Sequence, residues 1–167
     1  IHILLDAKLA AERAALKPAR GWMKSAQANW WGERMQNSFK GKRALLTGNS
    51  SGIGFHVALM LAQAGVRELV LNGRNAQRGE GASRAIAKHC PGAKVEFVAA
   101  DVSTPAGAQS VLEGGAKHLR GGIDILVNCA GGEHNPRLFR DYSADEIESV
   151  VRHWVLSTLY SCHYALP

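Results

Sequence analysis

The sequence predicts an α/β fold, a doubly wound parallel sheet with helices on both faces, preceded by a helical N-terminal extension. From Gly41 onward, short apolar runs of strand length alternate with segments of helix length, a pattern typical of βαβ units. A glycine-rich run at residues 47–54 joins the first apolar run to the first helical segment. No apolar run approaches the roughly 18 residues that a membrane span needs. The 167 residues therefore predict one α/β domain with a short extension.

The first 38 residues predict a basic helical extension, separate from the sheet domain. Residues 1–16 carry leucine and alanine along one stripe, with charged residues between, which indicates a helix. Pro18 and Gly21 end this helix. Residues 22–37 predict a second, shorter helix. It carries three tryptophans, Trp22, Trp30 and Trp31, which suit either a membrane interface or a core or subunit contact.

Residues 39–167 predict the sheet domain. Strands are expected at residues 42–47, 67–72, 94–99 and 123–128. Helices are expected at residues 52–64, 76–89, 105–119 and 144–166. Thr104 is the expected N-cap of the third helix, and Ser143 with Glu146 predicts a capping box before the fourth. Right-handed crossovers then give the strand order 3-2-1-4 of a Rossmann-type sheet.

The turn after the first strand predicts a binding site for a dinucleotide pyrophosphate, because ligands of this fold lie at the carboxyl ends of the strands. Its glycines are spaced Gly-x3-Gly-x-Gly. Gly48 permits a tight turn, Gly52 lets the backbone approach phosphate, and Gly54 allows close packing of helix on sheet. The helix start offers free N–H groups and a positive dipole end. The remaining candidates in this turn are Ser50, Ser51 and Ile53.

The turn after the second strand points to the choice of dinucleotide. A carboxylate is expected here when the ribose carries a free 2′-hydroxyl, but the chain has Arg74 within Asn-Gly-Arg-Asn. A guanidinium pairs with a 2′-phosphate in a forked, charge-assisted contact. Arg74 therefore favours NADP over NAD as the cofactor. The alternative is a solvent-exposed arginine without a ligand.

The turns after the third and fourth strands complete the candidate site. Asp101 at a strand end can bond an adenine amine while Val102 packs on the ring face; the alternative for Asp101 is an N-cap or turn role. Asn128 can bridge neighbouring strand ends through its amide. Ala130 and Gly131 are small enough for the chain to pass close to a cofactor.

Together these four turns resemble the short-chain dehydrogenase/reductase family over residues 39–167. Residues 47–54 look like its T-G-x3-G-x-G cofactor motif, and residues 128–131 resemble its N-N-A-G motif, with Cys129 replacing the second Asn. Asp101 resembles its adenine-contacting Asp, and the Gly-Arg pair at residues 73–74 resembles its NADP-preferring form. The resemblance implies an NADP-dependent oxidoreductase that interconverts a carbonyl and an alcohol on a small molecule, as a homo-oligomer.

The resemblance stops at the catalytic groups. Family members use a Tyr-x3-Lys pair and an upstream Ser, but no tyrosine here has a lysine four residues on. The catalytic residues are therefore unassigned, and we expect them after Pro167, together with further sheet to cover the open edge of the fourth strand. The family's relay Asn aligns with Trp154. That replacement motivates an alternative function, a non-catalytic NADP-binding sensor or structural subunit of a complex.

Charge and cysteine content limit the partners. The formal net charge is +6, and residues 1–43 carry all of it, because positive and negative residues balance over 44–167. We expect residues 1–38 to contact a membrane surface or a protein, and no nucleic acid; the alternative is a solvated helix face. The cysteines and histidines show no metal-ligand spacing, so we expect no metal. Three unpaired cysteines fit a reducing, cytoplasmic compartment.

Overall fold

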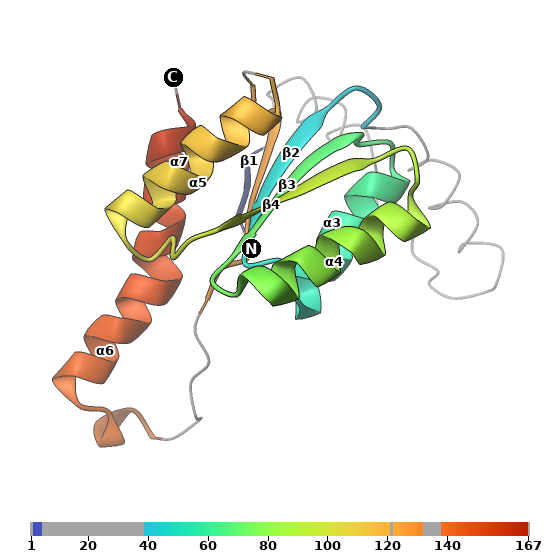
Figure 1. Ribbon diagram of the computed structural model, residues 1–167. Coiled ribbons are helices and arrows are strands. Elements are labelled where there is room, and N and C mark those ends of the chain that lie inside the picture. The colour runs from blue at the N-terminus through green and yellow to red at the C-terminus, as the bar shows by residue number, and fades with distance from the viewer. Residues whose placement is uncertain (1, 5–38, 121, 132–137, 167) are drawn as a thin grey trace, which may run out of the picture.

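The computed structural model describes residues 2–4, 39–120, 122–131 and 138–166. Its sheet has the order β1-β5-β2-β3-β4 (Figure 1). Four of these strands are parallel to one another: β2 (Arg43–Thr47), β3 (Glu68–Gly73), β4 (Lys94–Ala99) and β5 (Ile125–Asn128). Counted along the chain, these four strands lie in the order 3-2-1-4, which confirms the predicted topology.

Helices cover both faces of the sheet. Helices α3 (Gly52–Gln63) and α4 (Ala76–His89) lie on one face, and α5 (Pro105–His118) lies on the other beside the last helix (Figure 1). Neighbouring strand residues point to opposite sides. Leu46 therefore belongs to the core cluster beneath α3 and α4, whereas Leu45 belongs to the cluster beneath α5. This two-sided burial explains why β2, β3 and β5 consist almost wholly of buried residues.

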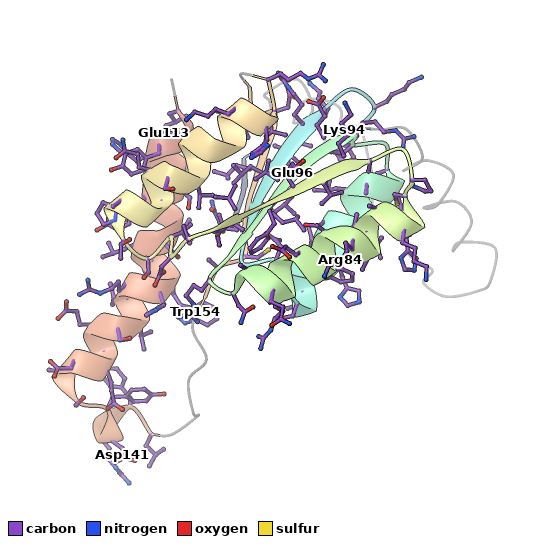
Figure 2. The ribbon with its side chains drawn as sticks, in the orientation of Figure 1. Arg84, Lys94, Glu96, Glu113, Asp141 and Trp154 are labelled. Carbon is purple, nitrogen blue, oxygen red and sulfur yellow. The ribbon has the colours of Figure 1, made fainter. Side chains whose placement is uncertain are left out.

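Strand β4 forms the far edge of the sheet. Its burial alternates, and Lys94, Glu96 and Ala99 are exposed. Figure 2 shows Lys94 and Glu96 along this edge. Charged side chains on an edge strand disfavour pairing with another sheet.

Side-chain caps begin three of the helices. Asn75 accepts from the N–H of Arg78 at the start of α4, and Thr104 accepts from the N–H of Gly107 at the start of α5. Helix α6 (Ala144–Val151) begins with a capping box in which Ser143 and Glu146 bond each other's backbone N–H. The caps predicted at Thr104 and Ser143 are thus confirmed.

The long final helix contains a π-helical turn that the sequence did not predict. The turn η2 (Arg152–Leu156) lies between α6 and α7 (Ser157–Ala165). Three hydroxyls bond carbonyls one turn back: Ser157 to His153, Thr158 to Trp154 and Ser161 to Ser157. Such back-bonding competes with the regular helical pattern and bends helices, and π turns are frequent at functional sites.

The helix predicted for residues 1–16 is wrong at its start. Residues His2–Leu4 form strand β1, which pairs antiparallel with β5 from His2↔Asn128 to Leu4↔Leu126. The free edge of β5 offers unpaired backbone groups, and pairing them outweighs a weak local helix pattern. The same pairing covers the edge that we expected a later segment to cover. Residues 5–38, with Trp22, Trp30 and Trp31, lie outside the described residues.

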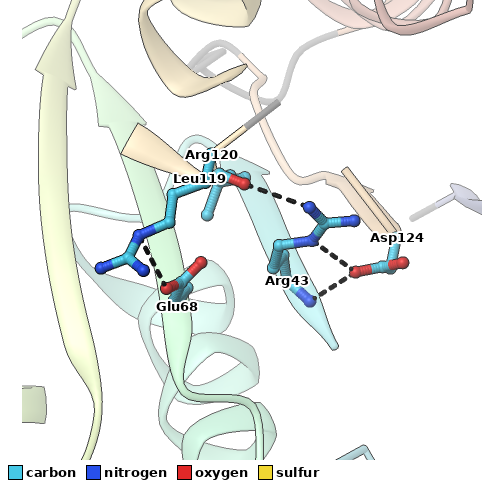
Figure 3. Close-up of polar contacts among 5 residues, drawn as sticks. All are labelled: Arg43, Glu68, Leu119, Arg120 and Asp124. Atoms are coloured by element: carbon cyan, nitrogen blue, oxygen red, sulfur yellow. Dashed lines mark hydrogen bonds and ion pairs between the residues drawn. The ribbon is translucent and has the colours of Figure 1, made fainter. Parts of the chain in front are cut away.

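A polar clasp holds the amino edge of the sheet, opposite the candidate site (Figure 3). The backbone N–H and Nε of Arg43 both donate to Oδ2 of Asp124, at 2.8 and 3.0 Å. A further guanidinium N–H of Arg43 donates to the carbonyl of Leu119 at 3.3 Å. The start of β2 is therefore tied to the connection between α5 and β5.

In the described part of the chain, no helix is long and apolar enough to span a bilayer.

Candidate functional site

The carboxyl ends of the four parallel strands meet at one edge of the sheet, and the predicted site residues follow them. Residues 48–54 come after β2, Arg74 directly after β3, Asp101 shortly after β4, and residues 129–131 after β5. The parallel register brings these turns to one edge. Every candidate residue therefore lies at or beneath this edge.

The glycine turn is a tight backbone cradle. Gly48 has a φ of 72°, a conformation that other residues rarely adopt. A Cβ built on Gly48 would lie 2.6 Å from the backbone N and Cα of Ala130, so the turns after β2 and β5 pack backbone against backbone. A Cβ on Gly54 would lie 2.5 Å from the carbonyl oxygen of Gly48. The first and third glycines thus have no room for a side chain.

The second glycine faces open space at the start of helix α3. Gly52 has a φ of 60°, and a Cβ built on it would meet nothing within 4 Å. Ser51, at the N-cap position, makes no side-chain cap bond, and the first turn of α3 contains no acidic residue. Ser51, Gly52 and Ile53 are all exposed. The first N–H groups of α3 and its positive dipole end are therefore available to an anion, which is the chemistry a pyrophosphate requires.

Two buried asparagines that the sequence analysis did not select as site residues hold this edge together. Asn49 donates from its backbone N–H to the carbonyl of Asn72 at 3.0 Å, and its Nδ2 donates to the carbonyl of Gly54 at 3.0 Å. Asn72 donates from Nδ2 to the carbonyls of Val98 and Ala100, both at 3.0 Å. These bonds fix the glycine turn relative to the ends of β3 and β4. In the sequence, Asn49 and Asn72 are polar residues at or just after the end of an apolar strand, and this pattern could have identified them as residues that bond neighbouring strand ends.

Asn128 joins β5 to its neighbours. Its Oδ1 accepts from the hydroxyl of Thr47 at 3.5 Å, and its Nδ2 lies 3.5 Å from Sγ of Cys162 on α7. The N–H of Ala130 in turn donates to the Thr47 hydroxyl at 3.4 Å. Burial raises the pKa of the neighbouring Cys129 thiol, which keeps it protonated and suits a packing role.

The turn after β4 presents a carboxylate. Oδ1 of Asp101 accepts from the N–H of Ser103 at 2.9 Å, so Asp101 does shape a turn. Partial burial acts to raise the pKa of Asp101, but the hydrogen bonds from Ser103 and the charges of Arg74 and His153 together outweigh it, so the net shift is downward. Val102 is only 4% exposed and packs in the core beneath α5, so Asp101 is the more accessible of the two.

Arg74 is exposed at the end of β3 and within electrostatic reach of Asp101. It lies beside the start of helix α4, whose first turn contains no acidic residue. The hydroxyl of Ser50 borders the same place, since a Cβ built on Gly73 would lie 3.4 Å from its Oγ. This corner of the edge therefore combines a cation, a hydroxyl and a carboxylate.

The π turn places Trp154 at the opposite corner. A Cβ built on Gly131 would lie 3.4 Å from Cε2 and Cζ2 of the indole, so the ring packs against the turn after β5. Figure 2 shows Trp154 between the last helix and the carboxyl edge of the sheet. Trp154 remains 53% exposed there.

Among the described residues, no group of three histidine, cysteine or acidic side chains is arranged to hold a metal ion.

Comparison with known proteins adds a family match to this geometry. Residues 42–167 match the family model described as short chain dehydrogenase. A 1,6-dihydroxycyclohexa-2,4-diene-1-carboxylate dehydrogenase of Pseudomonas putida is 36% identical over 132 residues, covering 79% of this chain and 47% of that protein. An uncharacterized oxidoreductase of Staphylococcus aureus strain N315 is 32% identical over 126 residues, covering 75% of this chain and 52% of that protein. The chain spans about half the length of these curated relatives.

Solved structures share the fold. L-Sorbose reductase from Gluconobacter frateurii, complexed with NADPH and L-sorbose, matches with a TM-score of 0.70 and 32% identity, over 78% of this chain and 48% of that one. An NADH-dependent reductase, A1-R', complexed with NAD, matches with a TM-score of 0.69 and 26% identity, over 78% of this chain and 53% of that one.

Proposed function

Because the chain belongs to the short-chain dehydrogenase/reductase family, we propose that it supplies the NADP-binding half of an oxidoreductase that interconverts a carbonyl and an alcohol. The proposal includes a small-molecule substrate, a cytoplasmic location and assembly into a homo-oligomer. Bound NADP supplies the hydride chemistry. The residues of this chain bind and orient it at the carboxyl edge of the sheet.

The start of helix α3 is the observation that carries this proposal. A helix whose first N–H groups have neither a side-chain cap nor an acidic neighbour is suited to bind the pyrophosphate. Gly52 leaves space for the phosphates, and Gly48 and Gly54 keep the turn narrow. Ser50, Ser51 and Ile53 line the same turn and complete the proposed pyrophosphate site.

The ends of β3 and β4 are the proposed adenosine side. Arg74 provides the cation for a 2′-phosphate. The lowered pKa of Asp101 keeps its carboxylate ionised at neutral pH, so it can accept from the adenine amine, while the neighbouring Val102 packs in the core rather than on the adenine ring. Asn128, Ala130 and Gly131 border the remainder of the cofactor. Similar solved structures hold NADPH in one case and NAD in another, so the preference for NADP rests on Arg74.

Replacing Arg74 tests the cofactor preference. We expect Arg74→Ala to weaken NADPH binding by about tenfold or more, since a charge-assisted contact is worth roughly 1.5–3 kcal/mol. NADH binding should change little, because NADH has no 2′-phosphate. Calorimetric titration of both dinucleotides measures this difference.

Arg84→Ala is the matched control. Arg84 lies further along α4, highly exposed and paired with Glu80, and Figure 2 shows it on that helix. Its loss should leave both affinities unchanged. Equal weakening of NADPH and NADH in Arg74→Ala would contradict the phosphate role, and failure of the unchanged protein to bind either dinucleotide would contradict the cofactor site itself.

A second candidate function is a non-catalytic NADP-binding sensor or structural subunit. Trp154 favours it, because the sequence predicts Trp154 at the position of the family's relay Asn, and an indole cannot reproduce the hydrogen bonding of an amide. NADPH-dependent turnover of a carbonyl substrate by the intact protein would argue against this function. NADPH binding without turnover of any carbonyl in a broad panel would favour it.

A further inference from the structure

The amino edge of the sheet, opposite the candidate site, gathers positive charge from several segments of the chain. Because β2 to β5 are parallel, their first residues lie at this edge, and α4 and α5 return the chain to it (Figure 1). Basic residues lead into or begin three of the strands and occupy the last turns of both helices. Apart from two arginines that are ion-paired, the cations of this edge are Lys40, Lys42, Arg67, Lys88, Lys94 and Lys117.

The carboxylates at the strand starts of this edge are already paired (Figure 3). Asp124 pairs with Arg43 at 3.0 Å, and Glu68 pairs with Arg120 at 3.7 Å. Lys42 also lowers the pKa of Asp124, but the hydrogen bond from Arg43 is the larger cause. Within the described ranges, no ion pair joins any of the six remaining cations to a carboxylate. The edge therefore keeps an excess of positive charge.

Backbone contacts place these cations next to one another although they come from separate segments. The N–H of Lys94 donates to the carbonyl of Arg67 at 2.6 Å. Arg43, Glu68 and Lys94 lie in one register across β2, β3 and β4, and Lys42 directly precedes Arg43. The strand starts thus form a single row of basic residues that is interrupted only by a paired carboxylate.

Helix stability accounts for only part of this arrangement. Lys88 and Lys117 lie in the last turns of α4 and α5, where a cation interacts favourably with the negative end of the helix dipole. Lys40, Lys42 and Arg67 lie outside the helices, in the segments that lead into β2 and β3. Like charges held together repel one another, and an anionic partner relieves that repulsion.

The segment that enters the domain at this edge indicates which anionic partner fits. The N–H of Phe39 donates to the carbonyl of Ala64, just after α3, at 3.0 Å. The sequence before Phe39 carries Trp22, Trp30 and Trp31. Tryptophan is enriched at membrane–water interfaces, and neighbouring basic residues are attracted to anionic lipid headgroups.

We propose that the amino edge of the sheet is a docking surface for an anionic lipid membrane. Five of the six unpaired cations are lysines, whose compact charge lacks the planar fork of arginine and suits a diffuse layer of headgroups. In this orientation the carboxyl edge of the sheet faces away from the membrane, so the candidate site stays accessible. The proposal goes beyond the proposed function and does not depend on it.

Vesicle sedimentation of the full chain tests this proposal. The vesicles are phosphatidylcholine alone, or phosphatidylcholine with about 30% phosphatidylserine. We expect binding to the anionic vesicles only, and weaker binding as salt is added, because salt screens exposed charges. A triple variant with Lys40→Gln, Lys94→Gln and Lys117→Gln should bind the anionic vesicles about tenfold more weakly or less still.

The matched control removes three cations elsewhere, with Arg84→Gln, Arg140→Gln and Arg152→Gln. These exposed side chains lie on α4, in η1 (Phe139–Asp141) and in η2, and the variant has the same net charge as the lysine variant. It should keep its affinity for the anionic vesicles within about twofold.

Four results would overturn the proposal. Equal losses in the two triple variants would mean that net charge, and not the amino edge, decides binding. Equal binding to both kinds of vesicle would exclude attraction to anionic headgroups. Absence of binding by the unaltered chain would exclude membrane docking, and tighter binding to a DNA duplex than to the anionic vesicles would assign the edge to nucleic acid instead.

Discussion

Gly48 is the residue on which the geometry of the glycine turn depends most directly. Its φ of 72° and the 2.6 Å approach of Ala130 to a built Cβ leave no room for any side chain. We expect Gly48→Ala to lower the free energy of unfolding by more than about 2 kcal/mol, because the left-handed conformation alone costs an alanine about 1–2 kcal/mol. Urea denaturation measures the change.

Gly81→Ala is the matched comparison for Gly48→Ala. Gly81 lies within α4, and a Cβ built on it would meet nothing within 4 Å. Alanine is the better helix former, so this substitution should stabilise the protein by about 0.5–1 kcal/mol. A Gly48→Ala protein as stable as the unaltered chain would contradict the described packing of the two turns.

Single residues also mark the limit of prediction from sequence. Gly48, Gly52 and Gly54 could be assigned to a turn because their spacing is local. Asn49 could not be assigned, because its partner Asn72 is 23 positions away in the sequence and the bond depends on the register of β2 with β3. Val102 was expected to face a ligand, yet its side chain is buried in the core beneath α5. Such choices depend on the neighbouring elements.

The first turns of helices α5 and α3 differ in side-chain capping, and this difference predicts different losses of stability when the residue at each N-cap position is replaced. Thr104 caps α5, whereas Ser51 makes no cap bond at α3. We expect Thr104→Ala to lower the free energy of unfolding by about 1 kcal/mol. Ser51→Ala should change it by much less, since no cap bond is lost. Equal losses in urea denaturation would contradict an uncapped α3 and, with it, the availability of its N–H groups.

The elements from residue 42 onward were predictable in type and close to their bounds. The ranges 76–89 and 94–99 match α4 and β4. The capping box at Ser143 was also predictable, because all of its groups lie within four residues. The π turn was not, since its pattern continues that of an α-helix. Strand β1 was missed because an edge strand of three residues depends on the partner that it meets.

The clasp between Arg43 and Asp124 predicts how the stability of the fold depends on pH (Figure 3). The side-chain hydrogen bond from Arg43 lowers the pKa of Asp124, with a backbone N–H and the charges of Arg43 and Lys42 adding to it, against partial burial. A carboxylate with a lowered pKa stabilises the folded state above its unfolded pKa of about 3.9. This contribution is lost as the pH falls through the folded pKa.

Asp124→Asn tests this linkage. At neutral pH we expect the variant to be less stable than the unaltered protein, because it cannot form the ion pair with Arg43. The difference in unfolding free energy should shrink as the pH falls below about 4, where the carboxyl of Asp124 takes up a proton in the unfolded chain, and it is lost as the pH falls through the lower folded pKa. Urea denaturation across this pH range provides the measurement. A difference that stays constant would contradict the ionised clasp.

The sequence alone determined the class of fold, the order of the four parallel strands and the turns that form the candidate site, because βαβ periodicity and glycine spacing are local properties that few topologies satisfy. The tertiary structure decided what lies beside those turns. It buried Asn49 and Asn72 between strand ends, turned Val102 into the core, paired β1 with β5 and packed Trp154 on Gly131. Each of these contacts joins residues far apart in the chain, so it follows from register and packing rather than from local pattern.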